Sequence, residues 1–453
     1  MSHARKWEPV CPKLRRLQEI ARDRKEERFT SLAHHITEEA LLRSHRSLNG
    51  RACAGVDGVA KQMYGKELFA NIKLLHESLK SGAYRATPSR REWIGKADGS
   101  KRPLGIPALE DKIVQGAVVE TLNCIYEEGF LGFSYGFRPG RSAHQALRAL
   151  QTVLQKGRVN WALEVGVKGF FDNIDHKELM SMLKRRVVDG RVLRLIAKWL
   201  RAGVMEKDGS RTRSRKGAPQ GGVVSPLLAN VFLHYVVDEF VHNWRKTEAK
   251  GEVCIVRYAD DFVIALERED EAMELLRLLT ERLAGYGLSV NTQKTRLVRF
   301  GRGGGSGTFD FLGLTRIAGK DRRGGYLVRR KTARKRFTRS LQAVTEWRRK
   351  RRHEAMSWQW SELCVKLRGD YNYYGVRGNY EALARFRDKA WKRWMVSLRR
   401  RSQKSDINRL YTLLKDRFKL PSPTITHPDN WLDVDPGYLL GRAGCGNAAR
   451  PVL

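Results

Sequence analysis

Two adjacent carboxylates, Asp260 and Asp261, are the residues of this 453-residue chain best suited to chemistry. They lie between two short apolar runs, 253–256 and 262–266, a pattern that predicts two strands joined by a tight turn. Like charges this close raise each other's pKa and oppose folding, and a divalent cation would remove that cost. A solvated turn is the alternative interpretation, because aspartate is a favoured turn residue.

A basic hairpin is predicted well before this pair. The segment 91–107 reads as two strand-like arms around the turn Ala97-Asp98-Gly99-Ser100, with basic residues on both arms. Lys96 and Arg102 would then converge on one anion, such as a phosphate. A solvated basic hairpin without a ligand is the alternative.

A strand followed by a helix is predicted between these two hairpins. In the segment 161–168, apolar residues alternate with Glu164, Gly166 and Lys168, which is the period of a half-buried strand. Asp175, with a glutamate three residues later, forms a capping-box-like start for the helix that follows.

A glycine-rich loop, 217–222, precedes an apolar helix and contains Gln220. Its glycines allow the backbone to approach a base or sugar closely. Earlier in the chain, the glycine-punctuated loop 134–141 leads to Ser142, which is placed to cap a helix over 143–154.

The formal charge of +38, from 87 Lys and Arg against 49 Asp and Glu, implies a polyanionic partner. Nucleic acid is the default candidate. A membrane is disfavoured because we find no apolar run of 18 residues and no signal peptide. The six scattered cysteines predict free thiols in a reducing compartment rather than disulfides or zinc. We therefore expect a soluble, cytoplasmic protein.

The positive charge is concentrated in residues 320–404, which hold 27 Lys and Arg against 7 Asp and Glu. Aromatic residues are interleaved with these charges, and the combination suits RNA, whose bases stack on aromatic rings. A helical bundle with an aromatic core would explain the aromatic residues but not the charge.

Five segments, taken together and in order, resemble the reverse-transcriptase fingers and palm of bacterial group II intron-encoded proteins. The segments are Lys101-Arg102-Pro103-Leu104-Gly105-Ile106-Pro107, Ser134 to Ser142, Lys168 to His176, Pro219 to Asn230, and Arg257-Tyr258-Ala259-Asp260-Asp261. The segment Leu367 to Gly375 further resembles the thumb and maturase domain of that family.

The resemblance implies an α+β right-hand polymerase whose fingers and palm contain antiparallel sheet, followed by a basic α-helical thumb. The implied division is an N-terminal helical extension over 1–80, fingers and palm over 81–315, a thumb/maturase (X) domain over 316–428, and a C-terminal tail over 429–453. The implied activity is RNA-directed DNA synthesis together with help in splicing. The implied partners are group II intron RNA, an RNA template with a DNA primer, deoxynucleoside triphosphates and a DNA target.

The resemblance also implies site residues. Asp260 and Asp261 would bind Mg²⁺ in a two-metal site that supports phosphoryl transfer. The nucleotide would be bound by Lys96, Arg102, Phe171, Gln220 and Lys294, with Phe171 excluding a ribose 2′-OH. RNA would be bound by Arg329, Arg330, Lys331, Arg334, Lys335, Arg336, Arg368, Tyr373 and Tyr374.

One departure from the family pattern affects the metal site. The position of Gly166 is an aspartate in the family, where it is the third metal ligand. Glu164 lies on the same face of the strand at about 7 Å and would partly substitute, whereas Asp172 is roughly 20 Å away along the chain. A loss of roughly 4 kcal/mol of stabilisation would cost about a thousandfold in rate.

Three functions remain open at this point. The protein is a working reverse transcriptase and maturase, or an RNA-binding maturase that keeps the polymerase fold as a scaffold, or a nucleic-acid-binding protein outside splicing. Primer extension by the unaltered chain and by Gly166→Asp separates the first two.

Overall fold

The computed structural model describes residues 11–95, 101–212, 216–301, 307–401, 411–412, 414 and 416–428. Lys96 and the predicted turn at 97–100 lie outside the described residues. None of the described helices combines the length and the apolarity needed to cross a bilayer.

The N-terminal helices pack onto the fingers and share their hydrophobic core. They are α1 (Pro12–Asp23), α2 (Glu38–Ser47), α3 (Lys61–Tyr64) and α4 (Leu68–Ser81), with short 3-10 turns at Ala33–His35 and Gly65–Glu67. Both α1 and α2 contact α5 (Leu109–Tyr126), where Arg43 pairs with Glu120 at 3.1 Å. The predicted N-terminal extension therefore shares one hydrophobic core with the fingers and does not form a separate unit.

The fingers contain a four-stranded sheet in the order β2-β1-β4-β5. Strands β1 (Ser89–Gly95) and β2 (Lys101–Ile106) are antiparallel, which confirms the predicted basic hairpin. The remaining strands are the short β4 (Val204–Met205), which pairs with β1, and the edge strand β5 (Arg211–Thr212); helices α8 (His176–Lys184) and α9 (Gly190–Arg201) precede them in the chain. The Asp175 carboxylate caps α8 by accepting the N–H groups of Lys177 and Glu178, as predicted.

The palm is built on an antiparallel sheet in the order β6-β7-β3-β8. Its strands are β3 (Trp161–Gly166), β6 (Val253–Tyr258), β7 (Asp261–Leu266) and β8 (Arg296–Arg299). Helix α6 (Ala143–Lys156), capped by Ser142 as predicted, packs on β6, and α12 (Glu269–Gly285) packs on β3 and β7. The prediction that β3 is half-buried was wrong, because residues 162–166 are buried on both faces of the strand.

Other helices surround this sheet. The short α7 (Phe170–Asn173) follows β3, and α10 (Ser225–Leu233) continues through a π-helical turn, His234–Asp238, into α11 (Glu239–Thr247). After α12 the chain makes an isolated antiparallel bridge between Val167 and Val290, and a turn that contains Lys294 follows.

A second antiparallel sheet, in the order β11-β10-β9, connects the palm to the thumb. Its strands are β9 (Thr308–Phe311), β10 (Leu314–Lys320) and β11 (Tyr326–Thr332). Leu314 and Val328 are buried in the large core of the fingers and palm. This sheet therefore packs with the palm, although the resemblance assigns residues from 316 onward to the thumb.

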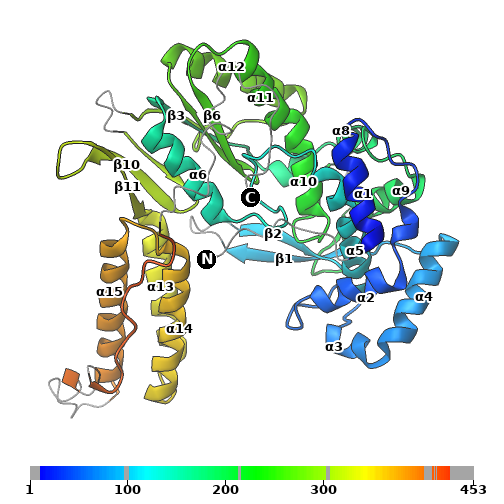
Figure 1. Cartoon of the computed structure of the whole chain (residues 1–453). Helices are drawn as coiled ribbons and strands as arrows, with labels where there is room; N and C mark the ends of the chain where they lie inside the picture. Colours follow the sequence, from blue (N-terminus) through cyan, green and yellow to red (C-terminus); the bar gives the residue numbers. More distant parts are fainter. Residues whose placement is uncertain are drawn as a thin grey trace.

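The thumb is a bundle of three helices that extends away from the palm (Figure 1). The helices are α13 (Arg334–Lys350), α14 (Met356–Tyr374) and α15 (Tyr380–Arg399), and they enclose a separate hydrophobic core. Aromatic residues contribute to this core, and the Trp394 indole N–H donates to Gln359 at 2.9 Å. Many aromatic residues of this segment thus serve the bundle, although Trp358 and Tyr380 are exposed. The bundle core does not account for the positive charge of the segment.

Candidate active site

The acidic pair lies at the tip of the hairpin formed by β6 and β7, as the sequence predicted. Tyr258 pairs with Asp261, which leaves Ala259 and Asp260 as a two-residue turn. Ala259 has φ +56°, in the left-handed region that residues other than glycine rarely adopt. This turn is therefore strained and needs support from its surroundings.

A buried ion pair supplies part of that support. The Arg257 guanidinium is fully buried and donates two hydrogen bonds to the Asp238 carboxylate, at 2.7 and 2.5 Å. Its Nη1 also donates to the Ala259 carbonyl oxygen at 3.0 Å and to the Asn230 Oδ1 at 3.1 Å. Sequence reasoning missed Asp238, and an arginine at the end of an otherwise apolar run was the only local signal.

The glycine-punctuated loop 134–141 packs closely against the same turn. The Asn230 side-chain amide donates to the Gly136 carbonyl at 2.7 Å, and the Tyr135 N–H donates to the Arg257 carbonyl at 2.9 Å. A Cβ atom at Gly136 would overlap the backbone of Tyr258 and Ala259, so only glycine fits. The loop and Asn230 thus act as positioning elements for the acidic turn.

Gly166 lies opposite Asp261, because the antiparallel register of β3 and β7 pairs these two residues. A Cβ atom at position 166 would lie 3.2 Å from both Cβ and Cδ of Lys294. The Lys294 side chain therefore occupies the space into which a longer side chain at 166 would extend. A Cβ atom alone would require Lys294 to move by a few tenths of an ångström.

Glu164, the suggested substitute ligand, is already engaged. One of its carboxylate oxygens pairs with Arg296, and the other accepts the Asp310 N–H at 2.9 Å. In the register of β3 and β7 it lies opposite Val263, two residues from the acidic turn. Within the described ranges, no three His, Cys, Asp or Glu side chains are grouped as a metal site. The structure gives no support to Glu164 as the third ligand.

Positive charge surrounds Asp261. Burial and then the neighbouring Asp260 raise the pKa of this carboxyl, while Lys294, Arg336 and Arg102 act in the opposite direction. These three cations come from a palm turn, the first turn of the thumb helix α13 and the fingers strand β2. The acidic turn therefore lies where palm, fingers and thumb approach one another.

Three predicted nucleotide-binding residues, Arg102, Phe171 and Gln220, line one cleft of about 530 Å³. The Arg102 Nε donates to the Gln220 Oε1 at 2.5 Å, and the Gln220 amide donates to the Asp172 Oδ1 at 3.3 Å. Sequence reasoning put Asp172 far from the metal site and did not expect this contact with Gln220. Of the remaining two predicted residues, Lys294 lies by Gly166 and Lys96 is outside the described residues.

Two further residues of the cleft were not foreseen. Phe137 packs its ring edge-on against Phe171 at 6.4 Å, is half exposed, and has φ +61°. Arg339, from the thumb helix α13, also lines the cleft. The only local signal for Phe137 was its place in the glycine-punctuated loop.

The predicted RNA-binding residues of the thumb fall into exposed and covered groups. Alternation along β11 exposes Arg329 and Lys331 but buries Arg330, which is only 4% exposed. Arg330 is therefore not available to a phosphate, contrary to the prediction. The exposed members of the set outside β11 are Arg334, Lys335, Arg336 and Arg368.

The two tyrosines of this set face the palm. The Tyr373 hydroxyl donates to the Leu312 carbonyl at 3.0 Å, and its ring lies 5.3 Å from that of His144. Tyr374 is half-buried and packs against the large core. Both rings dock the thumb on the palm, so less of their surface is open to a base than the sequence suggested.

Comparison with known proteins agrees with this geometry. Residues 94–316 match the family model described as reverse transcriptase (RNA-dependent DNA polymerase). The chain is 34% identical to protein YkfC of Escherichia coli over 312 residues, which cover 61% of this chain and 79% of YkfC. The chain belongs to the family of group II intron-encoded reverse transcriptases.

Other members of the family are longer. The group II intron-encoded protein LtrA of Lactococcus lactis is 36% identical over 235 residues, which cover 51% of this chain and 39% of LtrA. An uncharacterised 91 kDa protein of a cob intron in Schizosaccharomyces pombe is 34% identical over 278 residues, covering 50% of this chain and 34% of that protein. The predicted α+β fold, with fingers, palm and a helical thumb, is confirmed.

Proposed function

We propose that this protein is an RNA-binding maturase of the reverse-transcriptase family, in which DNA synthesis is weak. The observation that carries the proposal is the pairing of Gly166 with Asp261, since it leaves the acidic turn facing a residue without a side chain. The engagement of Glu164 by Arg296 and Asp310 supports it, because no other described carboxylate completes the site.

The cleft supports a retained capacity for nucleotides. Arg102 would neutralise a triphosphate, Gln220 would contact the base or sugar, and Phe171 would stand against the sugar. Because these three residues line one cleft, they favour the second candidate function, a working RNA-directed DNA polymerase. Its substrates would be an RNA template with a DNA primer and deoxynucleoside triphosphates.

Only part of the implied metal site fits this chain. Asp260 and Asp261 would hold a Mg²⁺ ion that arrives with the triphosphate, since Mg²⁺ accepts one or two carboxylates together with substrate phosphates. Such an ion would neutralise negative charge on the reacting phosphates. A site with three carboxylates does not fit the described residues.

The exposed cations of the thumb support binding to RNA, with group II intron RNA as the partner that the family membership suggests. Arg329, Lys331, Arg334, Lys335 and Arg336 lie within one short stretch that runs from β11 into α13. Phosphate neutralisation by such a stretch gives strong, salt-dependent binding. Arg336 also lies within the electrostatic reach of Asp261.

Two assays on the full chain test the proposal. Fluorescence anisotropy measures binding to a group II intron RNA and to an RNA template annealed to a DNA primer, and primer extension with Mg²⁺ measures synthesis. We expect binding to both, weak extension by the unaltered chain, and stronger extension by Gly166→Asp. Efficient extension by the unaltered chain would establish the second candidate, and absence of RNA binding would refute both.

A further inference from the structure

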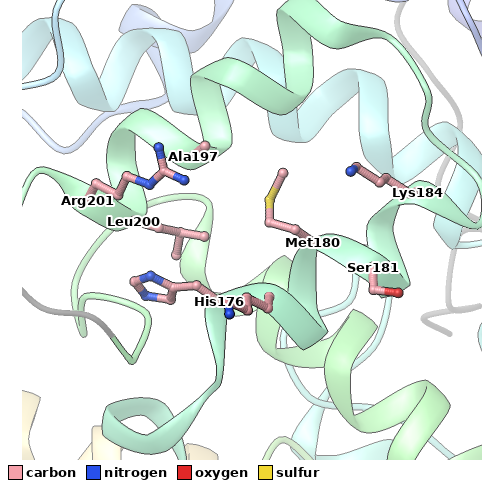
Figure 2. Close-up of a pocket in the computed structure, with 8 residues that line it drawn as sticks. His176, Met180, Ser181, Lys184, Ala197, Leu200 and Arg201 are labelled. Atoms are coloured by element: carbon pink, nitrogen blue, oxygen red, sulfur yellow. The ribbon is translucent and has the colours of Figure 1, made fainter.

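A pocket of about 340 Å³ opens between helices α8 and α9, and none of the roles proposed above uses it. Its floor is apolar, made by Met180, Ala197 and Leu200. Figure 2 shows the Met180 side chain rising in the middle, with Arg201 toward one end and Lys184 toward the other. The pocket thus combines an apolar centre with separated positive charges.

The charge of the pocket is unbalanced. Lys177, Lys184 and Arg201 are exposed, and no ion pair of their side chains occurs within the described part of the chain. None of the described residues that line the pocket is acidic. The nearby Asp175 carboxylate is turned to the N-terminus of α8, where it accepts two backbone N–H groups. The cations are therefore free to meet an anionic ligand.

We propose that this pocket binds one unpaired nucleotide of a single-stranded RNA. The base would rest on Met180 and Leu200, while the phosphates on either side would contact Lys184 and Arg201. Unstacked bases on apolar side chains, with basic residues along the backbone, are the usual means of binding single-stranded RNA. The volume lies within the range of small-ligand pockets. The inference rests on the proposed RNA-binding function and adds a site outside the cleft.

The pocket is joined to the nucleotide cleft by short contacts. The His176 Nε2, in the pocket wall, donates to the Gly217 carbonyl at 2.8 Å. Gly217 starts the loop that carries Gln220, and its N–H donates to the Ile174 carbonyl at 2.7 Å. The next residue, Ala218, donates its N–H to the Phe171 carbonyl at 2.8 Å.

Gly217 has no room for a side chain, which makes this connection stiff. A Cβ atom there would lie 2.9 Å from the carbonyl oxygens of Phe171 and Asp172, and its φ of +89° also favours glycine. RNA that contacts His176 would therefore be coupled, through Gly217, to the segments that position Phe171 and Gln220. The pocket provides an anchor for RNA beside the cleft, not merely additional positive surface.

Photo-crosslinking locates the RNA directly. The probe is a short oligouridine that contains one thiouridine, mixed with the full chain, irradiated and digested for mass spectrometry. We expect crosslinked peptides from α8 and α9, within 176–184 and 197–201. Crosslinks elsewhere in the chain without any in these peptides would overturn the pocket and leave the RNA-binding function standing. No RNA binding at all would overturn the proposed function itself, and this inference with it.

Two variants separate the phosphate contacts from the base contact, both measured by anisotropy at several salt concentrations. Lys184→Ala with Arg201→Ala should reduce the slope of log affinity against log salt by about 1.4, since each single-strand phosphate contact contributes about 0.7. Met180→Gln should weaken binding about tenfold with an unchanged slope, because it makes the apolar floor polar without removing charge.

A matched control removes two exposed lysines from another surface. Lys246→Ala with Lys250→Ala, on α11 and the turn after it, should leave the crosslinks within 176–184 and 197–201 unchanged. If both double variants reduce the slope of log RNA affinity against log salt by the same amount, the pocket is not a specific RNA site. Oligoglutamate provides the last comparison. If Lys184→Ala with Arg201→Ala abolishes binding of oligoglutamate but leaves RNA binding unchanged, the ligand of the pocket is an acidic peptide and the proposal is refuted.

Discussion

Gly166 and Asp261 are directly paired across strands β3 and β7, and the Lys294 side chain lies over the glycine. The residue whose counterpart is an acid in the family pattern therefore lies beside the acidic turn, but as a glycine it supplies no ligand. Because β3 lies between β7 and β8 and is buried on both faces, its register cannot slip without moving the core. The carboxylate that we propose to be missing therefore concerns one side chain, and the register of the palm strands around it is fixed by the core.

A series of substitutions at this position tests its role in catalysis. We expect Gly166→Asp to raise the rate of primer extension by up to about a thousandfold, which corresponds to roughly 4 kcal/mol of recovered stabilisation. Gly166→Asn has nearly the same shape but no charge, and Gly166→Ala adds only the Cβ atom that meets Lys294. Neither should increase the rate. Equal gains with Asn and Asp would show that packing, not the carboxylate, limits synthesis.

Phe171 should control the choice of sugar, and the restored Gly166→Asp chain is the background in which to measure it. Phe171 is buried, packs against Phe137 and Phe170, and lines the cleft beside Gln220. Replacing it by alanine opens space near the sugar, so ribonucleotide use should rise about tenfold relative to deoxyribonucleotide use.

The measurement is single-nucleotide insertion with each type of triphosphate. Phe69→Ala, on the outer face of α4 where the ring is 72% exposed, is the matched control and should leave the ratio unchanged. An unchanged ratio with Phe171→Ala would remove Phe171 from the nucleotide site.

The buried pair of Arg257 and Asp238 should dominate the stability of the palm turn. Removing one partner leaves an uncompensated buried charge, so Arg257→Met or Asp238→Asn should each cost about 3–5 kcal/mol of unfolding free energy. Arg277→Met breaks an exposed pair with Glu281 and should cost about 0.5 kcal/mol or less. Urea denaturation measures all three, and similar costs for Arg257→Met and Arg277→Met would contradict the prediction.

The exposed cations near the start of the thumb should bind RNA. Replacing Arg329, Lys331, Arg334, Lys335 and Arg336 by alanine should weaken RNA binding and lower the salt slope by up to about 4. Arg330 offers an internal contrast, since it is buried in β11 between them. Arg330→Met should lower stability and leave the slope unchanged. A slope that does not respond to the five substitutions would place the RNA elsewhere.

Asp370 should make the thumb sensitive to pH. Burial within α14 raises the pKa of this carboxyl from 3.8 to about 7, so the folded chain keeps a proton that the unfolded chain releases. Its contribution to stability is therefore complete below about pH 4 and is lost as the pH rises through about 7.

Substitution by asparagine removes this dependence. Asp370→Asn should stabilise the protein at pH 8 by up to about 2 kcal/mol and by less than about half of that at pH 5. Asp388→Asn, at an exposed position of α15, is the control and should show no such difference. Thermal or urea unfolding at both pH values provides the measurement, and equal effects of Asp370→Asn at the two values would contradict the assigned burial.

Local patterns in the sequence determined the features that depend on neighbouring residues. Two apolar runs around a polar turn predicted the hairpin that carries Asp260 and Asp261, and cap residues predicted the starts of α6 and α8. The ordered segments were enough to indicate the family and its fold. Net charge indicated a polyanionic partner because charge accumulates along the chain regardless of its folding.

The tertiary structure decided everything that depends on which distant side chains meet. Glu164 lay on the correct face of its strand, but strand pairing placed Arg296 and the Asp310 N–H against it. Alternation along β11 turned Arg330 inward because one face of that strand packs on the palm. Arg257 and Asp238 lie on separate elements and meet only in the folded core. Pairing registers and packing of distant segments set these contacts, and no local pattern of residue types contains them.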